Sequence, residues 1–541
     1  MNGSAEVIFI NGLIYTVDSA FSETSAVAAG NGKILCAGSD DEVKKYLGSG
    51  TKVIDLKGRT VLPGIIESHM HMQAYGLKLL NIDCFGKTRA EILNEVKAAY
   101  KNIRQGQWIT GTGWNETGWD DKQLPVKQEL DEIAPNVPIY ISRVCGHLAW
   151  VNSAALAAAG IDGSTPDPAG GEIHRDAAGN ATGILVDTAA SLVQDRIPAI
   201  EETTLEKAYK LAQDDFLKHG ITSIHDLALS SFYDYGTVEF IAGMYRKGAM
   251  KISIYSYISA DNAEAAYSAG AFTGAFGGKF SMKGVKVFTD GSLGARSAWM
   301  LEDYSDRPGH RGNCRYSDKE LYELMAAARK NGFQIATHAI GDAANRQVLS
   351  VYERILRDFP EPADHRSRTE HAQIIKRDDV TRLLSLGVIP SMQFVHCTSD
   401  KEMTEERIGA GRLGDAFPWR SFIDGGAIIP GGADAPVELV NPFHGIYAAV
   451  TRKDRSGGPE GGWRPEQKLT RIEAIKAFTI WGAYASFEEG VKGSIEAGKA
   501  ADFTIIDRDI MNCPEDEIKD ISVIATILGG ETAYDADGCF S

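Results

Sequence analysis

The sequence contains no apolar run of about 18 residues, the length that a membrane-spanning helix requires. Its first six residues lack a basic stretch followed by an apolar one, so we expect no secretory signal peptide. Lysine and arginine form no cluster, and the formal net charge is −17. Because phosphate groups and anionic lipids attract clustered positive charge, we expect no nucleic acid and no membrane among the partners.

Cysteine is scarce and has no pattern. The seven cysteines are scattered along the chain without paired spacing, which indicates reduced thiols and a cytoplasmic protein. The chain of 541 residues is too long for a single compact core, and 43% of it is hydrophobic and 24% charged. We therefore expect one large globular domain with accessory parts.

The two ends of the chain have the same character. Residues 1–60 consist of short apolar strands with turns at Asn11-Gly12 and Asn31-Gly32, and residues 490–541 contain similar strands. Each piece is too short to bury a sheet face well by itself. We expect the two pieces to pack together as one small composite β domain, with residues 61–489 inserted between them.

In the inserted region, short apolar strands alternate with amphipathic helices. One helix is expected to begin after Ser317 and to end near Gly332. The expected strands are residues 61–68, 221–224, 252–257, 284–288, 334–337, 368–370, 388–391 and 427–430. This alternation predicts an α/β fold, a (β/α)8 barrel of the TIM type, with residues 80–200 as an inserted subdomain.

The first barrel strand ends in His69-Met70-His71. Because side chains alternate along a strand, the two imidazoles point to the same side. Neutral imidazoles are common ligands of transition metals. A barrel enzyme keeps its chemistry at the carboxyl ends of its strands, where these two histidines lie. The pair is therefore a candidate half of a metal site.

Further ligand-type residues follow the other expected strands. In chain order they are His225 and Asp226, Lys286, His338, His371 and Asp434. Because the strand ends of a barrel meet at one face, these side chains can converge, and imidazole and carboxylate are the donors that zinc uses. Each histidine taken singly is more often a hydrogen-bonded core or surface residue, and it is their conjunction that favours a metal site.

Together with several longer motifs, these residues make the chain resemble the amidohydrolase superfamily. Specifically, it resembles amidohydrolase family 3 and the branch that contains N-substituted formamide deformylase. The motifs that carry the resemblance are Asp55 to Gly64 leading into His69-Met70-His71, Gly146 to Asn152, Thr289 to Gly294, Thr337 to Asp342, Thr369 to Gln373, Gly432 to Pro436 and Lys492 to Asp502. The resemblance covers nearly the whole chain.

The resemblance implies a metal-dependent hydrolase with a barrel and a composite β domain. It implies that His69, His71 and Asp434 bind one divalent metal ion, and that His338 and His371 bind a second. Lys286, carboxylated by carbon dioxide, is expected to bridge the two ions. The expected cofactor is zinc, one or two ions per chain.

The expected reaction is hydrolysis of the C–N bond of an amide-type small molecule, an N-substituted formamide or N-acyl compound, by metal-activated hydroxide. Asp434 is the expected catalytic residue, first as general base toward the attacking water and then as general acid toward the departing amine. Candidate substrate-binding residues are Trp114, Trp119, His147, Asp290 and His396. For the two tryptophans, packing within the insert is an equally good interpretation.

Three alternatives stay open at this point. The same chemistry would serve a lactone or carbamate hydrolase. A ring aminohydrolase of the superfamily is less favoured, because its fifth-strand motif resembles His-x-x-Glu and Gly341 stands at that glutamate's position here. A non-catalytic regulatory protein on the same fold is the third, and a full ligand set speaks against it. The oligomeric state is open, with a homodimer as one alternative.

Overall fold

The computed structural model describes residues 4–104, 106–143, 148–168, 171–198, 200–229 and 233–540. The chain divides into two compact units. Unit 1 combines Met1–Met72 with Gln213–Ser541, and unit 2 is Gln73–Ala212. The insert expected at residues 80–200 lies within unit 2, which extends beyond it at both ends.

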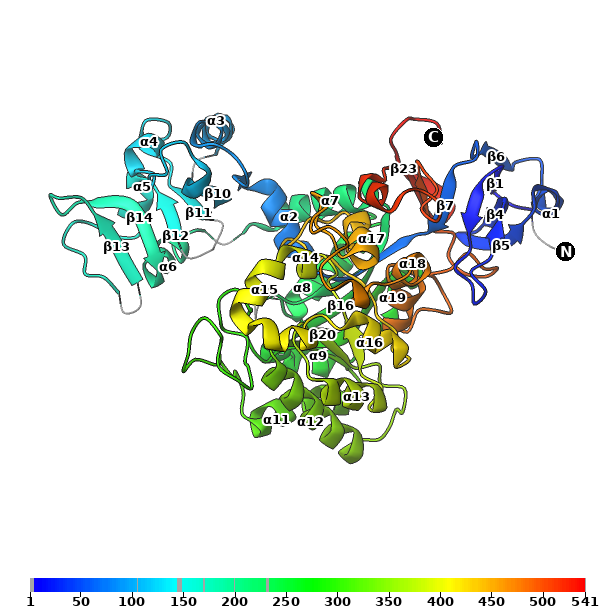
Figure 1. Ribbon diagram of the computed structural model, residues 1–541. Coiled ribbons are helices and arrows are strands. Elements are labelled where there is room, and N and C mark those ends of the chain that lie inside the picture. Colours follow the sequence, from blue (N-terminus) through cyan, green and yellow to red (C-terminus); the bar gives the residue numbers. More distant parts are fainter. Residues whose placement is uncertain are drawn as a thin grey trace. The chain divides into compact units, whose positions relative to one another are not determined.

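Unit 1 is built around a barrel of parallel strands that alternate with helices (Figure 1). In spatial order the strands are β8 (Ile65–Met70), β15 (Ile221–Leu227), β16 (Ser253–Ser259), β18 (Phe280–Phe288), β19 (Gln334–Ala339), β20 (Arg368–His371) and β21 (Ile389–Ser391). The helices of this region include α8 (Tyr235–Arg246), α9 (Glu264–Ala269), α11 (Asp318–Lys330), α12 (Asp342–Asp358), α13 (Arg377–Ser385), α14 (His396–Ser399), α15 (Lys401–Ile408), α16 (Trp419–Asp424), α17 (Pro442–Thr451), α18 (Arg471–Ala477) and α19 (Ile480–Ala485). The predicted (β/α)8 fold is confirmed.

Local sequence explains why these elements form where they do. All seven residues of β16 are buried, as expected for a parallel strand that is covered on both faces. At the start of α11, the Ser317 hydroxyl caps the backbone N–H of Glu320, and the Glu320 side chain caps Ser317 in return. The chain leaves this helix through Gly332, whose φ of +76° favours glycine. The helix predicted after Ser317 is therefore confirmed.

The eighth strand, expected at residues 427–430, is not a regular strand. Residues 427–435, here called the closing segment, nevertheless complete the ring. On one side, the Met392 N–H donates to the Pro430 carbonyl at 3.0 Å, and on the other the Ser68 N–H donates to the Gly431 carbonyl at 3.0 Å. Pro430 has no N–H to contribute to a strand ladder, which explains the irregular backbone.

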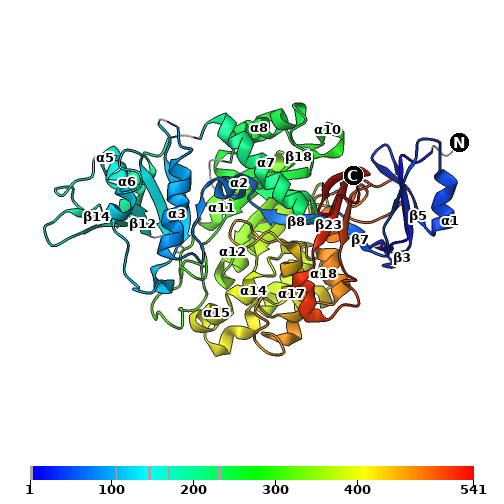
Figure 2. The same cartoon turned by 90° about the horizontal axis from the view of Figure 1, so that it is seen from above.

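Two sheets in unit 1 are built from strands near the ends of the chain. One sheet has the order β24 (Glu531–Asp535), β23 (Val523–Leu528), β22 (Phe503–Ile506), β7 (Thr60–Pro63), β2 (Leu13–Tyr15) and β3 (Glu23–Thr24). The other has the order β5 (Lys33–Gly38), β4 (Ala26–Gly30), β1 (Val7–Ile10) and β6 (Lys52–Asp55). Figure 2 shows β23 close to β7, and β22 pairs with β7 antiparallel. The composite β domain is thus part of the fold.

Unit 2 contains its own sheet and core. The sheet order is β13 (Gly171–Arg175), β14 (Ala181–Asp187), β12 (Leu148–Val151), β11 (Ile139–Arg143), β10 (Ile109–Trp114) and β9 (Ile82–Asp83). Helices of this unit include α3 (Arg89–Tyr100), α4 (Lys127–Asp131), α5 (Ser153–Ala158) and α6 (Thr188–Gln194). Among the described residues of the whole chain, no helix combines the length and the apolar character needed to cross a membrane.

The core shared by the two sheets near the chain ends can be tested through Phe503. This side chain is buried and packs edge-to-face on Phe9, with ring centroids 5.7 Å apart. We expect Phe503→Ala to lower the free energy of unfolding by about 3–5 kcal/mol, because it removes a large buried ring and leaves a cavity. Chemical denaturation measures the loss. Val53→Ala, at a half-exposed valine of β6, is the control, and an equal loss in both variants would contradict this packing.

Candidate metal centre

All six predicted metal ligands line one cavity of about 360 Å³ in unit 1. They come from different parts of the barrel, at the carboxyl ends of its strands or directly after them. The cavity is lined by His69, His71, Leu229, Lys286, Phe288, Ser292, Leu293, Gly294, His338, Ile340, His371, Gln373, His396, Asp400, Met403, Asp434, Val437 and Glu438. The convergence expected from the strand order therefore occurs.

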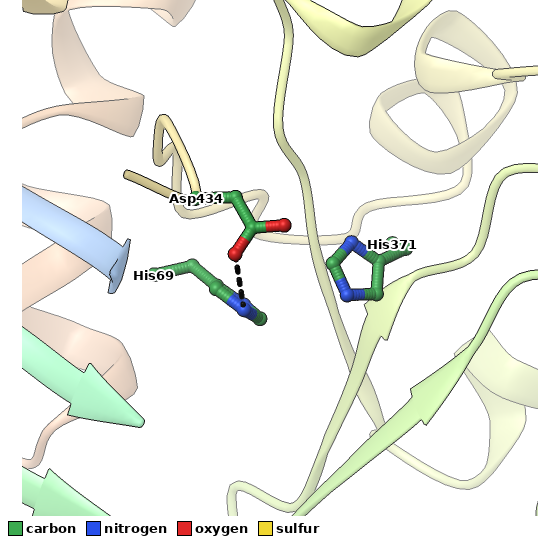
Figure 3. Close-up of side chains that lie close together, drawn as sticks. All are labelled: His69, His371 and Asp434. Carbon is green, nitrogen blue, oxygen red and sulfur yellow. Dashed lines mark ion pairs between the residues drawn. The ribbon is translucent and has the colours of Figure 1, made fainter. Parts of the chain in front are cut away.

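At the base of this cavity, His69, His371 and Asp434 face one another (Figure 3). Their candidate ligand atoms all lie within 4.8 Å of one another, and His69 Nε2 is 3.4 Å from Asp434 Oδ1. Among the described residues, His69 Nε2, His371 Nδ1 and Asp434 Oδ1 are buried atoms without a hydrogen-bond partner. Such atoms are costly to bury unpaired, and a centre of divalent metal would satisfy all three. The residues present therefore fit a metal ion.

His71 is oriented for the same site. Its Nε2 lies 2.9 Å from Asp434 Oδ1, and its Nδ1 donates a hydrogen bond to the Leu227 carbonyl at 2.6 Å. The bond at Nδ1 fixes the tautomer and leaves Nε2 unprotonated for a metal ion. His71 Nε2 and Asp434 Oδ1 therefore face each other as two acceptors with no proton between them, an arrangement that a bound cation would stabilise.

A buried carboxylate binds the ring nitrogen of His69 that faces away from Asp434. His69 Nδ1 donates to Glu370 Oε2 at 2.6 Å, which directs Nε2 toward Asp434. Arg368 in turn donates to both oxygens of Glu370, at 2.7 and 3.0 Å. Burial raises the pKa of Glu370, but the charge of Arg368 and the His69 bond outweigh it and hold the pKa well below its usual range. Glu370 is therefore an anion that orients His69, a predicted metal ligand.

Arg368 makes further hydrogen bonds that fix its own position. Its guanidinium donates to the Ser68 carbonyl, the Ser391 hydroxyl, the Tyr257 hydroxyl and His225 Nδ1, at 2.7, 2.7, 3.0 and 2.9 Å. These groups belong to β8, β21, β16 and β15. Thus a side chain with no exposed surface connects five barrel strands, its own included. His225, a candidate from its strand-end position, binds this arginine and is not on the cavity wall.

The closing segment places Asp434 through its backbone. Glu67 Oε1 accepts the Ala433 N–H at 2.8 Å, and the Asp434 N–H donates to the His69 carbonyl at 2.8 Å. A side chain at Gly432 would place its Cβ 2.5 Å from Glu67 Oε1, so only glycine permits this approach. Asp434 has a φ of +59°, a left-handed conformation that a non-glycine residue rarely adopts outside a constrained site.

Lys286 is buried on β18 and lines the same cavity. Burial lowers the pKa of its amine to about 8. His338 lies nearby on β19, with Nε2 3.4 Å from both Asp290 Oδ1 and the Gly291 carbonyl oxygen. Burial lowers the pKa of His338 to about 3, and it lowers those of His69 and His371 too. These imidazoles are therefore neutral, which is the form that binds metals.

Asp290, a predicted substrate-binding residue, lies next to His338. It was expected to contact substrate, but it does not line the cavity. Its oxygens accept the backbone N–H groups of Trp299, Ile340 and Gly341, at 2.9, 3.1 and 2.9 Å. Asp290 thus connects the segment after β18, which contains Trp299, to the residues that directly follow β19. One oxygen of Asp290 also lies 3.4 Å from His338 Nε2, so Asp290 helps to position that imidazole.

The other predicted substrate residues lie in different places. His396, the first residue of α14, lines the cavity, and its Nε2 is 3.9 Å from Asp434 Oδ2. Trp114 and Trp119 are buried in the core of unit 2, where their rings stack at 6.0 Å. Their indole N–H groups donate to the carbonyls of Ile141 and Lys87. Packing within the insert accounts for both, and His147 lies outside the described residues.

The sequence analysis did not identify Arg368 and Glu370, the two residues that position His69 by hydrogen bonds. Arg368 and Glu370 are spaced two apart on a short buried strand, so they share a face, and two charges inside a barrel are unusual unless paired. That spacing was the available signal. Gln373, which also lines the cavity, is the last residue of the Thr369 to Gln373 motif, but the sequence did not single it out as a site residue.

The geometry agrees with comparisons to known proteins. The family model described as "Amidohydrolase family" matches residues 52–534. The chain belongs to the amidohydrolase family. A relative in Arabidopsis thaliana, Protein LONG AFTER FAR-RED 3, is 33% identical, with 98% of this chain and 92% of that protein aligned.

Two further similarities bear on the chemistry of this amidohydrolase. N-substituted formamide deformylase of Arthrobacter pascens is 29% identical over 99% of this chain and all of that protein. A crystal structure of an uncharacterized metal-dependent hydrolase from Pyrococcus horikoshii is similar with a TM-score of 0.79 and 27% identity, covering 94% of this chain and 99% of that one. The predicted family and hydrolase class are confirmed, and a divalent metal is supported.

The role of Glu370 leads to a prediction about metal affinity. We expect Glu370→Gln to weaken divalent metal binding by about 10- to 100-fold, because the neutral amide no longer anchors His69 as an anion. Competition against a fluorescent chelator measures the affinity. Glu531→Gln, at an exposed residue of β24, is the matched control.

Because Glu370→Gln leaves Arg368 as an unpaired buried charge, circular dichroism must first show that the variant folds. If it does not, Arg368→Met combined with Glu370→Gln removes both charges and is expected to give the same weakening. Unchanged affinity in a folded variant would show that Glu370 does not orient the ligand.

Proposed function

We propose that this amidohydrolase uses a metal ion to cleave the C–N bond of an amide-type small molecule, an N-substituted formamide or another N-acyl compound. The observation that carries the proposal is the set of buried, unpartnered atoms on His69, His371 and Asp434, at the carboxyl ends of the barrel strands. The similarity to N-substituted formamide deformylase supports the substrate class. Hydrolysis by such a site needs no organic cofactor.

In the proposed site, His69, His71 and Asp434 hold one ion, and His338 and His371 hold a second. Zinc is the proposed metal, since imidazole and carboxylate donors suit it. When bound, the metal supplies Lewis acidity and a water that ionises near neutral pH. The remaining steps can be assigned to side chains of this chain.

Lys286 is proposed to carry a carboxylate. A cationic ammonium in this cavity would oppose the binding of a metal ion by like-charge repulsion. The neutral amine can instead attack carbon dioxide, forming an N–C bond and releasing a proton to solvent. The product is an anionic carbamate that can bridge two metal ions. Its position on the cavity wall beside the histidines supports this role.

Asp434 is proposed to move the proton. Its carboxylate is ionised and buried beside His69 and His71, so it can accept a proton from the attacking water. After the tetrahedral stage, the same oxygen delivers that proton to the departing nitrogen, which then leaves as a neutral amine. The C–N bond breaks, and the acyl carbon keeps the oxygen of water.

His396 is proposed to bind the substrate carbonyl. Gln373 Nε2 lies 3.4 Å from His396 Nδ1, and because an amide nitrogen can only donate, Nδ1 accepts there. The ring then carries its proton on Nε2, an atom that has no hydrogen-bond partner among the described residues. This N–H can donate to the carbonyl oxygen as negative charge develops on it.

We further propose that the protein acts in the cytoplasm, which fits the free state of all six cysteines that the structure describes.

The function is tested by removing and restoring the metal. A panel of N-substituted formamides, N-acyl amines and lactones is incubated with protein before and after treatment with a chelator. We expect amide hydrolysis that is lost on chelation and restored by zinc. Hydrolysis of lactones alone, or amide turnover that persists without metal, would contradict the proposal.

The role of Asp434 gives a sharper prediction. We expect Asp434→Asn to lower kcat by at least about 100-fold, because the amide cannot accept the proton of water. The amide oxygen can still serve as a ligand, so most of the metal should be retained, as elemental analysis would show. Asp378→Asn, at an exposed residue of α13, is the control. Near-normal kcat in Asp434→Asn would rule out this role.

A further inference from the structure

One side of the cavity carries two acidic groups that form no ion pair with a lysine or arginine among the described residues. They are Asp400 and Glu438. Lys286 is the one lysine or arginine among the described residues of the cavity wall, and it is assigned to the metal site. Burial raises the pKa of Asp400 and the negative charge of Glu438 adds to this, while His396 and the hydrogen bond from Gln373 partly oppose the rise.

Gln373 provides an independent indication that this side of the cavity binds a ligand. Its side chain is only 3% exposed and lines the cavity, and its Oε1 has no hydrogen-bond partner among the described residues. Its side chain is hydrogen-bonded to Asp400 and contacts His396. The Gln373 amide N–H is engaged by Asp400, but its buried carbonyl oxygen is left as an acceptor without a donor.

The neighbouring wall is apolar. Leu229 and Val437 line the cavity and are 48% and 63% exposed. Phe288, Leu293 and Met403 contribute further apolar surface. A ligand that fits both regions has an N–H-rich cationic end and a short apolar segment.

We propose that Asp400, Glu438 and Gln373 Oε1 bind a protonated amine of the substrate, which would make the substrate an amide derived from a diamine. This inference rests on the proposed amide hydrolysis for its reaction and deepens it. Hydrolysis adds water across the amide C–N bond and releases a carboxylic acid and the free diamine. The second amine takes no part in the bond changes and serves only for recognition.

The test compares two formamides that differ in one group. N-formyl-diaminobutane carries a terminal ammonium, and N-formyl-pentylamine has a methyl group in its place. We expect kcat/KM to favour the cationic compound by about tenfold or more, the usual size of a charged hydrogen-bond contribution. Glu438→Gln and Asp400→Asn should each lower that ratio by about tenfold.

Glu460→Gln makes the same chemical change at an exposed residue outside the cavity, and its ratio should equal that of the unmodified protein. A ratio near one in the unmodified protein, or a ratio that survives Glu438→Gln, would overturn the inference.

A binding measurement separates failure of the inference from failure of the proposed function. Calorimetry with the product diaminobutane, against neutral butanediol, reports the cation site without any turnover. Glu438-dependent binding of the diamine without hydrolysis of either formamide would retain the cation site and refute amide hydrolysis. Hydrolysis of both formamides at equal rates, with no binding of the diamine, would retain the function and refute the cation site.

Discussion

The ion pair between Arg368 and Glu370 is the interaction on which the site depends. Both side chains are fully buried inside the barrel, and each makes its partner's burial tolerable. Removing one partner of such a pair costs about 3–5 kcal/mol, because the other is left as an unpaired charge. The pair also positions the site, because Glu370 fixes the tautomer of His69 and Arg368 connects five strands through its hydrogen bonds. Packing and metal binding are therefore coupled through one contact.

The closing segment supplies the second constraint. It has to complete the barrel and carry Asp434 into the cavity, and a regular strand would not do both. Pro430 lacks the N–H of a regular strand, and Gly432 allows the backbone to approach Glu67 closely. Glu67 accepts a hydrogen bond from the Ala433 N–H, and Asp434 then adopts a left-handed conformation. Strain of this kind is stable only where the surroundings fix it. The cavity thus combines the proposed metal ligands with acidic and apolar residues that are proposed to select the substrate.

The sequence predicted the residues whose positions follow from a regular rule, either the alternation of side chains along a strand or the recurrence of strand ends in a barrel. His69 and His71 follow from strand alternation, and Lys286, His338 and His371 follow from their position at strand ends, which a barrel brings together. It did not predict Glu370 behind His69, because that contact joins strands far apart in the chain. It did not predict the hydrogen bonds of Asp290, because their backbone donors come from loops that no periodicity describes. Trp114 and Trp119 could not be assigned, since a buried tryptophan and a substrate-binding one look alike in sequence.

The central claim is that the cavity binds metal through imidazoles, Asp434 and a modified Lys286. Elemental analysis of protein purified without chelator tests it most directly, with Lys286→Ala analysed in parallel. The account predicts about two divalent ions per chain, and a clear loss of metal in Lys286→Ala. Absence of bound metal from the unmodified protein, even after addition of zinc, would contradict it.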